Sequence, residues 1–138
     1  MNLFILDLNP HKAAEYYQDL HVNKIIIEGS QLLAAAYSID RLKKEDCPRT
    51  QKGTPRTHGH YNHPMSKWVR ENMSNFQWTL QHIHALYQER IYRFNKPHFT
   101  YDFLQWCEQN LPPITTGSLT QHPQCFKVSF PQCIVEGN

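Results

Sequence analysis

Polar side chains recur at steps of three or four residues within an apolar stretch near the start of the chain. They are Tyr17, His21, Lys24, Glu28 and Gln31. Residues at this spacing lie on one face of an α-helix. A helix with so much apolar surface is usually buried, and a buried histidine, lysine or glutamate without a partner is costly. We therefore interpret this polar line as one wall of a binding site.

The residue types of this line suit a phosphorylated ligand. His21 and Lys24 can donate to phosphate or ribose oxygens. Glu28 can accept from a ribose hydroxyl or act as a general base, and Gln31 can read a ribose or base edge. The alternative is structural: the line faces solvent on an amphipathic helix, and Lys24 and Glu28 form an ordinary ion pair one turn apart.

A second polar cluster lies further along the chain and contains His58, His60 and His63. With Cys47 upstream, these side chains have a composition that zinc accepts, but their spacing matches no standard zinc finger. We therefore predict no metal and no cofactor. Hydrogen-bonded or solvated histidines are the better interpretation, and we expect His58 and His63 to contact the ligand.

Two residues that follow this cluster complete the predicted site. Trp68 offers a flat ring on which a base can stack, and Arg70 offers a planar fork of donors for phosphate. In this interpretation Lys24, Arg70 and His63 hold the phosphate, while Trp68 carries the base. The alternative for Trp68 is a place in the hydrophobic core.

These side chains must be positioned by helices, because apolar residues recur at steps of three and four over most of the chain. Asn9 and Pro10 are typical of a helix start. The predicted elements are helices over residues 10–18, 20–37, 65–94 and 99–110, a basic and histidine-rich loop over residues 38–64, and an irregular proline-rich tail over residues 112–138. We therefore predict an all-α fold, a compact single-domain helical bundle over residues 1–138.

Length and composition narrow the function. A chain of 138 residues is one domain, and its formal net charge of +2 is small for a protein that lives on DNA. Nucleic acid is thus an unlikely partner, whereas a small anion is not excluded. The apolar run at residues 3–6 is too short for a signal peptide or a membrane span. We expect a cytoplasmic protein without a membrane partner, whose four cysteines stay reduced.

The chain resembles a small phage-encoded protein family along most of its length. The matching residues include Asn2, Asp7, Asn9, Pro10, Tyr16, Asp19, His21, Val22, Lys24, Glu28, Gln31, Thr57, His58, Asn62, His63, Pro64, Trp68, Arg70, Asn75, Trp78, Glu89, Arg93, Lys96, His98, Thr120, Pro123, Gln124 and Cys125. This pattern is specific as a family signature but says little about chemistry by itself.

The resemblance suggests viral proteins that sequester nucleotide immune signals, such as cyclic ADP-ribose isomers or cyclic dinucleotides. Proteins of this sponge type, which counter Thoeris or CBASS defence, are small, often oligomeric, and have a deep polar pocket. The resemblance therefore implies a phage anti-defence protein that binds a small nucleotide in the host cytoplasm as a homo-oligomer. Sequestration needs no nucleophile, so we expect a binding protein rather than an enzyme.

Two enzymatic alternatives remain open. The turn at His63 and Pro64 is remotely similar to pyrimidine-dimer DNA glycosylases, which attack with the α-amine exposed by removal of the initiator methionine. Here Asn2 is bulky enough to block that removal. In the other alternative, His21 and His63 share acid–base work in a phosphodiesterase-like cleavage of a cyclic nucleotide.

Overall fold

The computed structural model describes the backbone of residues 19–120 and the side chains of residues 24–120. This described part is helical and contains no β-strand, as the sequence predicts. Its helices are α2 (Asp19–Ala34), α3 (Ile39–Lys43), α4 (Pro64–Glu71), α5 (Met73–Phe94) and α6 (Tyr101–Gln109). The predicted helix over residues 10–18 and residues 121–138 of the predicted tail lie outside the described residues.

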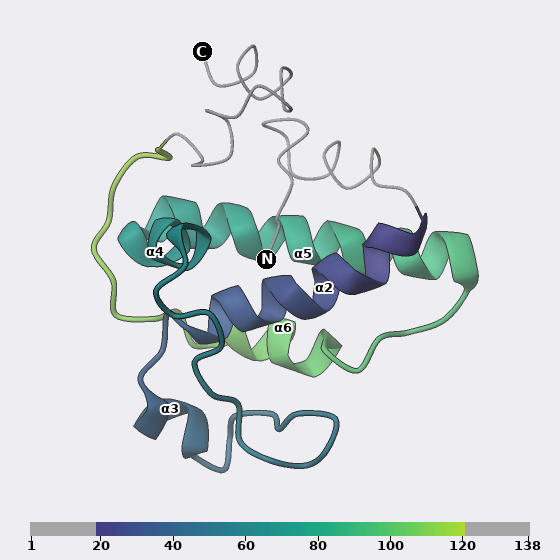
Figure 1. The fold of residues 1–138 in the computed structure, drawn as a ribbon, viewed down its shortest axis with the longest axis horizontal. Helices are drawn as coiled ribbons and strands as arrows, with labels where there is room; N and C mark the ends of the chain where they lie inside the picture. The colour runs from purple at the N-terminus through teal and green to yellow at the C-terminus, as the bar shows by residue number, and fades with distance from the viewer. Residues whose placement is uncertain (1–18, 121–138) are drawn as a thin grey trace.

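Helix α5 is the longest described element, and α2, α4 and α6 pack against it, whereas α3 lies apart from it at the bottom of the view (Figure 1). Of the described helices, α2 and α5 share the most extensive contact. They approach closely because Gly29 has no side chain: a Cβ atom there would lie 2.1 Å from Cδ1 of Ile83. Most apolar residues of α2, including Ile25, Ile26 and Leu33, are buried in the hydrophobic core. The prediction of a largely buried helix in this part of the chain is thus confirmed.

The predicted continuous helix over residues 65–94 is wrong, because the chain breaks at Asn72 into α4 and α5. The backbone of Asn72 is extended, with φ −155° and ψ 169°, and its side chain accepts a hydrogen bond from the backbone N–H of Asn75. An asparagine side chain competes with the helical backbone in this way and so favours a helix start. The apolar spacing continues across the break, which is why periodicity does not reveal it.

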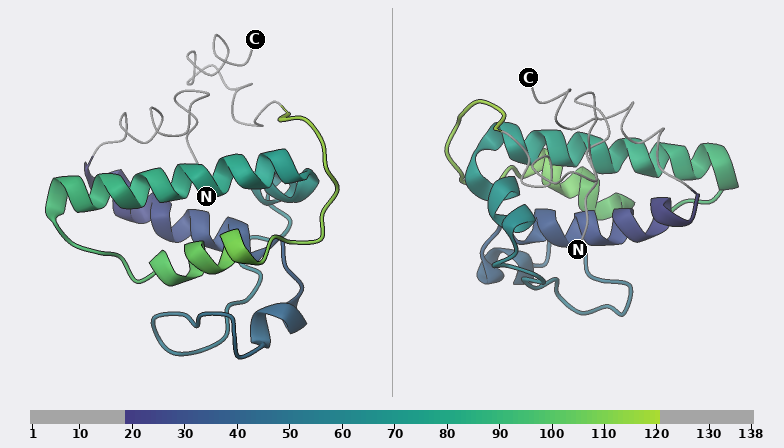
Figure 2. Two further views of the ribbon diagram at one scale, coloured as in Figure 1. Left: turned by 180° about the vertical axis from the view of Figure 1, so that it is seen from behind. Right: turned by 45° about the horizontal axis from the view of Figure 1, so that its top comes forward.

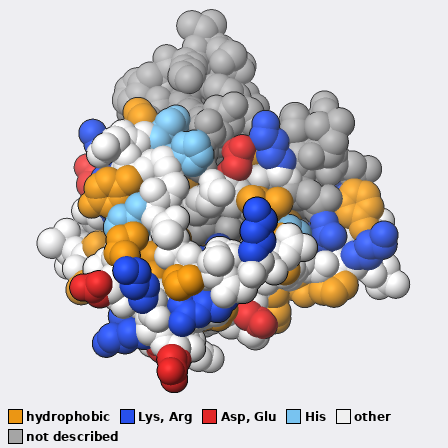
Figure 3. All heavy atoms as spheres, turned by 60° about the horizontal axis from the view of Figure 1, so that its bottom comes forward, with side chains coloured by type: hydrophobic (Ala, Val, Ile, Leu, Met, Phe, Trp, Pro, Cys, Tyr) orange, Lys and Arg blue, Asp and Glu red, His pale blue; other side chains and the backbone are white. Residues whose placement is uncertain are grey.

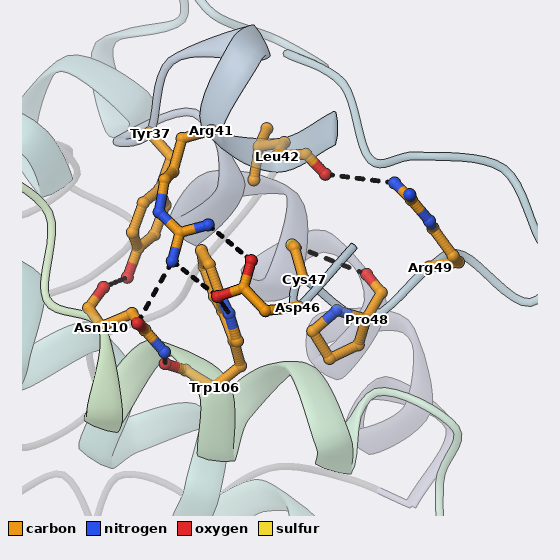
Figure 4. A network of polar contacts seen from close by, with 9 residues as sticks. All are labelled: Tyr37, Arg41, Leu42, Asp46, Cys47, Pro48, Arg49, Trp106 and Asn110. Carbon is orange, nitrogen blue, oxygen red and sulfur yellow. Dashed lines mark hydrogen bonds and ion pairs between the residues drawn. The ribbon is translucent and has the colours of Figure 1, made fainter. Parts of the chain in front are cut away.

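The predicted loop over residues 38–64 contains a short helix, α3. Ser38 caps its start by accepting a hydrogen bond from the backbone N–H of Arg41. Arg41 then holds Asp46 through two hydrogen bonds of 2.8 Å, and Asp46 also accepts from the indole of Trp106 at 3.1 Å (Figure 4). This contact fixes the beginning of the remaining loop to α6.

The described part of the predicted tail is irregular and runs past the junction of α4 and α5 (Figure 2). Its backbone carbonyls accept hydrogen bonds from side chains of that junction. Asn72 donates to Ser118 at 3.1 Å, and the indole of Trp68 donates to Thr120 at 3.2 Å. The tail therefore satisfies polar groups that the break between the two helices leaves open.

No helix in the described part of the chain has the length and apolar character needed to cross a membrane.

Candidate functional site

A pocket of about 340 Å³ lies between α2, the loop that joins α3 to α4, and Phe99. Helix α2 contributes Ile27, Ser30, Gln31 and Ala34, and the loop contributes most of residues 50–57. None of the described side chains that line the pocket is acidic. On the face that carries the loop, Lys and Arg side chains gather over the lower part of the surface (Figure 3).

Arg56 is the charged side chain that lies deepest in this lining. It is only 7% exposed. Its guanidinium carbon lies 4.1 Å from the ring centroid of Phe103, and its Nη1 donates to the hydroxyl of Ser30 at 3.4 Å. The other two nitrogens, Nε and Nη2, are buried and have no hydrogen-bond partner among the described residues. Arg56 is thus a buried cation whose donors are mostly unused.

Such an arrangement is energetically unfavourable in the empty protein. Burial lowers the pKa of the Arg56 guanidinium, yet an arginine keeps its charge at neutral pH. A buried charge normally needs a charged partner and hydrogen bonds to offset its desolvation. Since the pocket lining offers no carboxylate, a bound anion is the group that would complete the site.

The neighbouring titratable groups add no charge beside Arg56 at neutral pH. Burial raises the pKa of the Cys107 thiol to about 12 and raises the pKa of the Cys47 thiol as well. His98 is also buried, and its Nδ1 accepts the backbone N–H of Thr100 at 3.2 Å. Burial, and then the charges of Arg90 and Arg56, lower the pKa of His98 to about 4. Among the described residues, Arg56 therefore supplies the charge in the buried part of the pocket lining.

The rest of the lining combines apolar and polar surface. Ile27 and Phe99 are partly exposed, at 39% and 44%, and offer apolar walls. Gln31 brings an amide from α2, and the loop brings threonine hydroxyls and the exposed Lys52. A small molecule with one flat apolar part and one anionic part matches this mixture, which is usual for ligand pockets.

Of the eight residues predicted for the site, Gln31 is the one that lines this pocket. Lys24 is exposed and Glu28 is partly buried on α2, but neither belongs to the lining. The side chain of His21 lies outside the described residues. Of the described members of the polar line on α2, Gln31 therefore reaches the pocket and Lys24 and Glu28 do not.

The two predicted histidines of the loop have structural contacts. The Nε2 of His58 is hydrogen-bonded to the backbone carbonyl of Tyr37, and the His58 ring stacks on Tyr61 with centroids 4.8 Å apart. His63 caps α4, because its Nδ1 accepts the backbone N–H of Met65 at 3.0 Å. The spacing of histidines alone does not distinguish such structural contacts from contacts with a ligand.

Trp68 and Arg70 are also held by the protein. Trp68 is 5% exposed and packs edge-on against Trp78, so it has no free face for a base. Trp68 thus belongs to the hydrophobic core, which was the alternative to its predicted role in stacking. Arg70 lies 3.8 Å above the ring of Tyr61 and donates to the Tyr61 carbonyl at 2.7 Å.

Arg56 itself was missed by the sequence interpretation. It stands in a basic loop among proline, threonine and glycine, where an arginine is usually solvated. Only the docking of the loop against α2 and Phe103 buries it. The sole signal in the sequence was the length of the loop, because long loops in compact domains often carry function.

A second pocket of about 380 Å³ lies between α5 and α6. His84 Nε2 lies 2.8 Å from Glu108 Oε1, and Tyr87 stacks on Tyr101 with centroids 4.4 Å apart. These contacts join the two helices, and the described lining contains no lysine or arginine, so the pocket at Arg56 is the stronger candidate site for an anion.

Among the described residues, no three His, Cys, Asp or Glu side chains come together as metal ligands would. Comparison of the chain with protein-family models, with curated proteins and with solved structures finds no match.

Proposed function

We propose that the pocket at Arg56 binds a small nucleotide-type anion, and that the protein acts by holding this ligand. The observation that carries the proposal is the buried guanidinium of Arg56, whose Nε and Nη2 have no partner in the described part of the chain. Together with the resemblance to viral sponge proteins, it supports sequestration of a nucleotide immune signal as the biological role.

Each part of the lining has a role in this proposal. Arg56 lines the pocket and binds the phosphate, because a guanidinium presents a planar fork of donors to phosphate oxygens. Its Nε and Nη2 are buried in the ligand-free structure, so this binding includes a rotation of the side chain toward the pocket. Phe99 and Ile27 contact the base, and Gln31 reads a polar edge of the ligand. Lys52, at the exposed rim, adds a weak attraction that salt screens.

Binding without catalysis fits the residue types of the pocket. The described lining contains no histidine, carboxylate or cysteine that would serve as a general base or nucleophile. The phosphodiesterase alternative relied on His63, whose Nδ1 is engaged at the start of α4. The proposal therefore favours a ligand that is released unchanged.

Native mass spectrometry of the protein mixed with cyclic mononucleotides, cyclic dinucleotides and cyclic ADP-ribose tests the proposal. We expect a complex whose affinity falls roughly 10- to 100-fold in Arg56→Met, as for loss of charged hydrogen bonds. The matched control is Arg70→Met, which removes an arginine held by Tyr61 and should change affinity less than about twofold.

Two results would contradict the proposal. Binding that depends on Arg70 and not on Arg56 would place the site at the wall predicted from the sequence. Recovery of a cleaved nucleotide after heat denaturation of the complex would show catalysis, whereas recovery of intact ligand supports sequestration.

A further inference from the structure

We infer that the pocket at Arg56 selects a ligand with one negative charge at its phosphate, that is, a phosphodiester as in a cyclic nucleotide, over a phosphomonoester dianion. This inference rests on the proposed function and adds the ligand class. It follows from the charges of the described pocket lining, in which Arg56 is the one buried cation.

The described elements packed around Arg56 bring few charged groups to it. Helix α2 contributes Ser30 and Gln31, neither of which titrates. The loop contributes the buried Cys47 thiol and the exposed Lys52. Lys52 meets the ligand at the rim, where water and salt screen its charge.

The segment before α6 and α6 itself contribute His98 and Cys107. His98 accepts the backbone N–H of Thr100 at Nδ1, an arrangement of the neutral ring. The guanidinium groups of Arg56 and Arg90 act on His98 and further disfavour its protonation. Cys107 is buried and stays a thiol because burial raises its pKa. No second buried cation thus stands beside Arg56 in the described residues.

The consequence concerns the charge of the ligand. One phosphate charge beside Arg56 makes a neutral buried pair, whereas a second negative charge would be buried without a partner. A phosphodiester carries one charge throughout the neutral range. A phosphomonoester carries two above its second pKa of about 6 and one below it. The two ligand types are therefore distinguished by pH.

Calorimetric titration with 3′,5′-cyclic AMP and with 5′-AMP tests the inference, because these nucleotides share base and ribose. At pH about 7.5 we expect cyclic AMP to bind at least about tenfold more tightly. At pH about 5 the ratio should shrink to within about threefold, because 5′-AMP is then a monoanion. His98 stays neutral over this range, since its pKa is about 4.

A gain-of-charge variant makes the test independent of loss of folding. Thr57 lines the pocket and follows Arg56 in the chain, so Thr57→Lys adds a cation beside Arg56, in addition to Lys52 at the rim. Because Thr57 is exposed, salt screens this charge, and the variant is therefore compared with the parent chain at low ionic strength. This variant should raise the affinity for 5′-AMP at pH about 7.5 and leave that for cyclic AMP within about threefold.

Tighter binding of 5′-AMP at pH about 7.5, a ratio that does not change with pH, or no binding of either nucleotide would overturn the inference. A different result would contradict the proposed function: in the native mass spectra, no nucleotide would bind in a way that depends on Arg56.

Discussion

At the scale of single residues, Arg56 lies where its charge lowers the stability of the ligand-free protein. Its burial and its unused donors act against stability, and no carboxylate of the described pocket lining offsets them. Among the described residues, the ring of Phe103 and the hydroxyl of Ser30 contact the guanidinium favourably. Residues that bind ligands often carry such a cost in stability. The free energy of unfolding therefore separates a binding role from a structural role.

The substitution Arg56→Met keeps the apolar stem over Phe103 and removes the unpaired charge. We expect the ligand-free variant to be as stable as the parent chain or more stable, by up to about 2 kcal/mol, because replacing buried charge by apolar side chains is often stabilising. Urea unfolding at neutral pH measures this difference.

Arg49→Met is the control, because Arg49 donates to the carbonyls of Leu42 and Lys43 and should only lose these contacts. A loss of more than about 2 kcal/mol in Arg56→Met, as expected for breaking essential core contacts, would instead assign Arg56 a structural role.

His98 makes stability depend on pH. Its pKa falls from 6.5 to about 4 on folding, first because of burial and then because of Arg90 and Arg56. The unfolded chain therefore takes up a proton at a higher pH than the folded chain does. Stability should fall by about 2 kcal/mol as the pH drops from 6.5 to 4, and this contribution should become constant about one pH unit further down, where His98 is protonated in both states.

The variant His98→Asn tests this, since an asparagine oxygen can still accept the backbone N–H of Thr100 without titrating. Its stability should decline less than that of the parent chain over the same pH interval. His60→Asn is the matched control, because His60 is exposed and asparagine tolerates its positive φ of 57°. An unchanged decline in His98→Asn would assign the pH dependence to other groups.

At the scale of elements, the contact of α2 with α5 positions the pocket wall that α2 provides. This contact depends on Gly29, where a Cβ atom would lie 2.1 Å from Cδ1 and 2.7 Å from Cγ1 of the fully buried Ile83. The Ile83 side chain would have to rotate, or the two helices would have to move apart.

We expect Gly29→Ala to destabilise the protein by about 1 to 3 kcal/mol, as overpacked cores do. This loss exceeds the gain of about 1 kcal/mol that alanine brings to a helix interior. Thermal unfolding of the single variant measures the balance of the two effects.

The double variant Gly29→Ala with Ile83→Val removes Cδ1 and should recover part of the loss if the clash is its cause. Additive losses in the double variant would contradict the close contact between the two helices.

At the scale of the whole molecule, the all-α fold followed from apolar spacing, because spacing reports which face of a helix is buried. The break at Asn72 could not be predicted from this spacing, since an asparagine within an apolar pattern is compatible with both a helix interior and a helix start. The burial of Arg56 could not be predicted either, because it arises from long-range docking of a loop. Trp68 was misassigned for the same reason: tertiary contacts decide whether an aromatic ring is core or surface.

Ligand binding gives the last prediction, because the pocket joins α2, the loop and Phe99. At a ligand concentration 100-fold above Kd, the free energy of unfolding should rise by about 2.7 kcal/mol. Hydrogen exchange should slow most at residues 50–57 and at the end of α2, which line the pocket. Arg56→Met should lose this protection and Arg70→Met should keep it. Protection centred on residues 58–70 would instead indicate that the ligand binds at the residues that the sequence pattern predicts. The same native mass spectra would test the expected homo-oligomer.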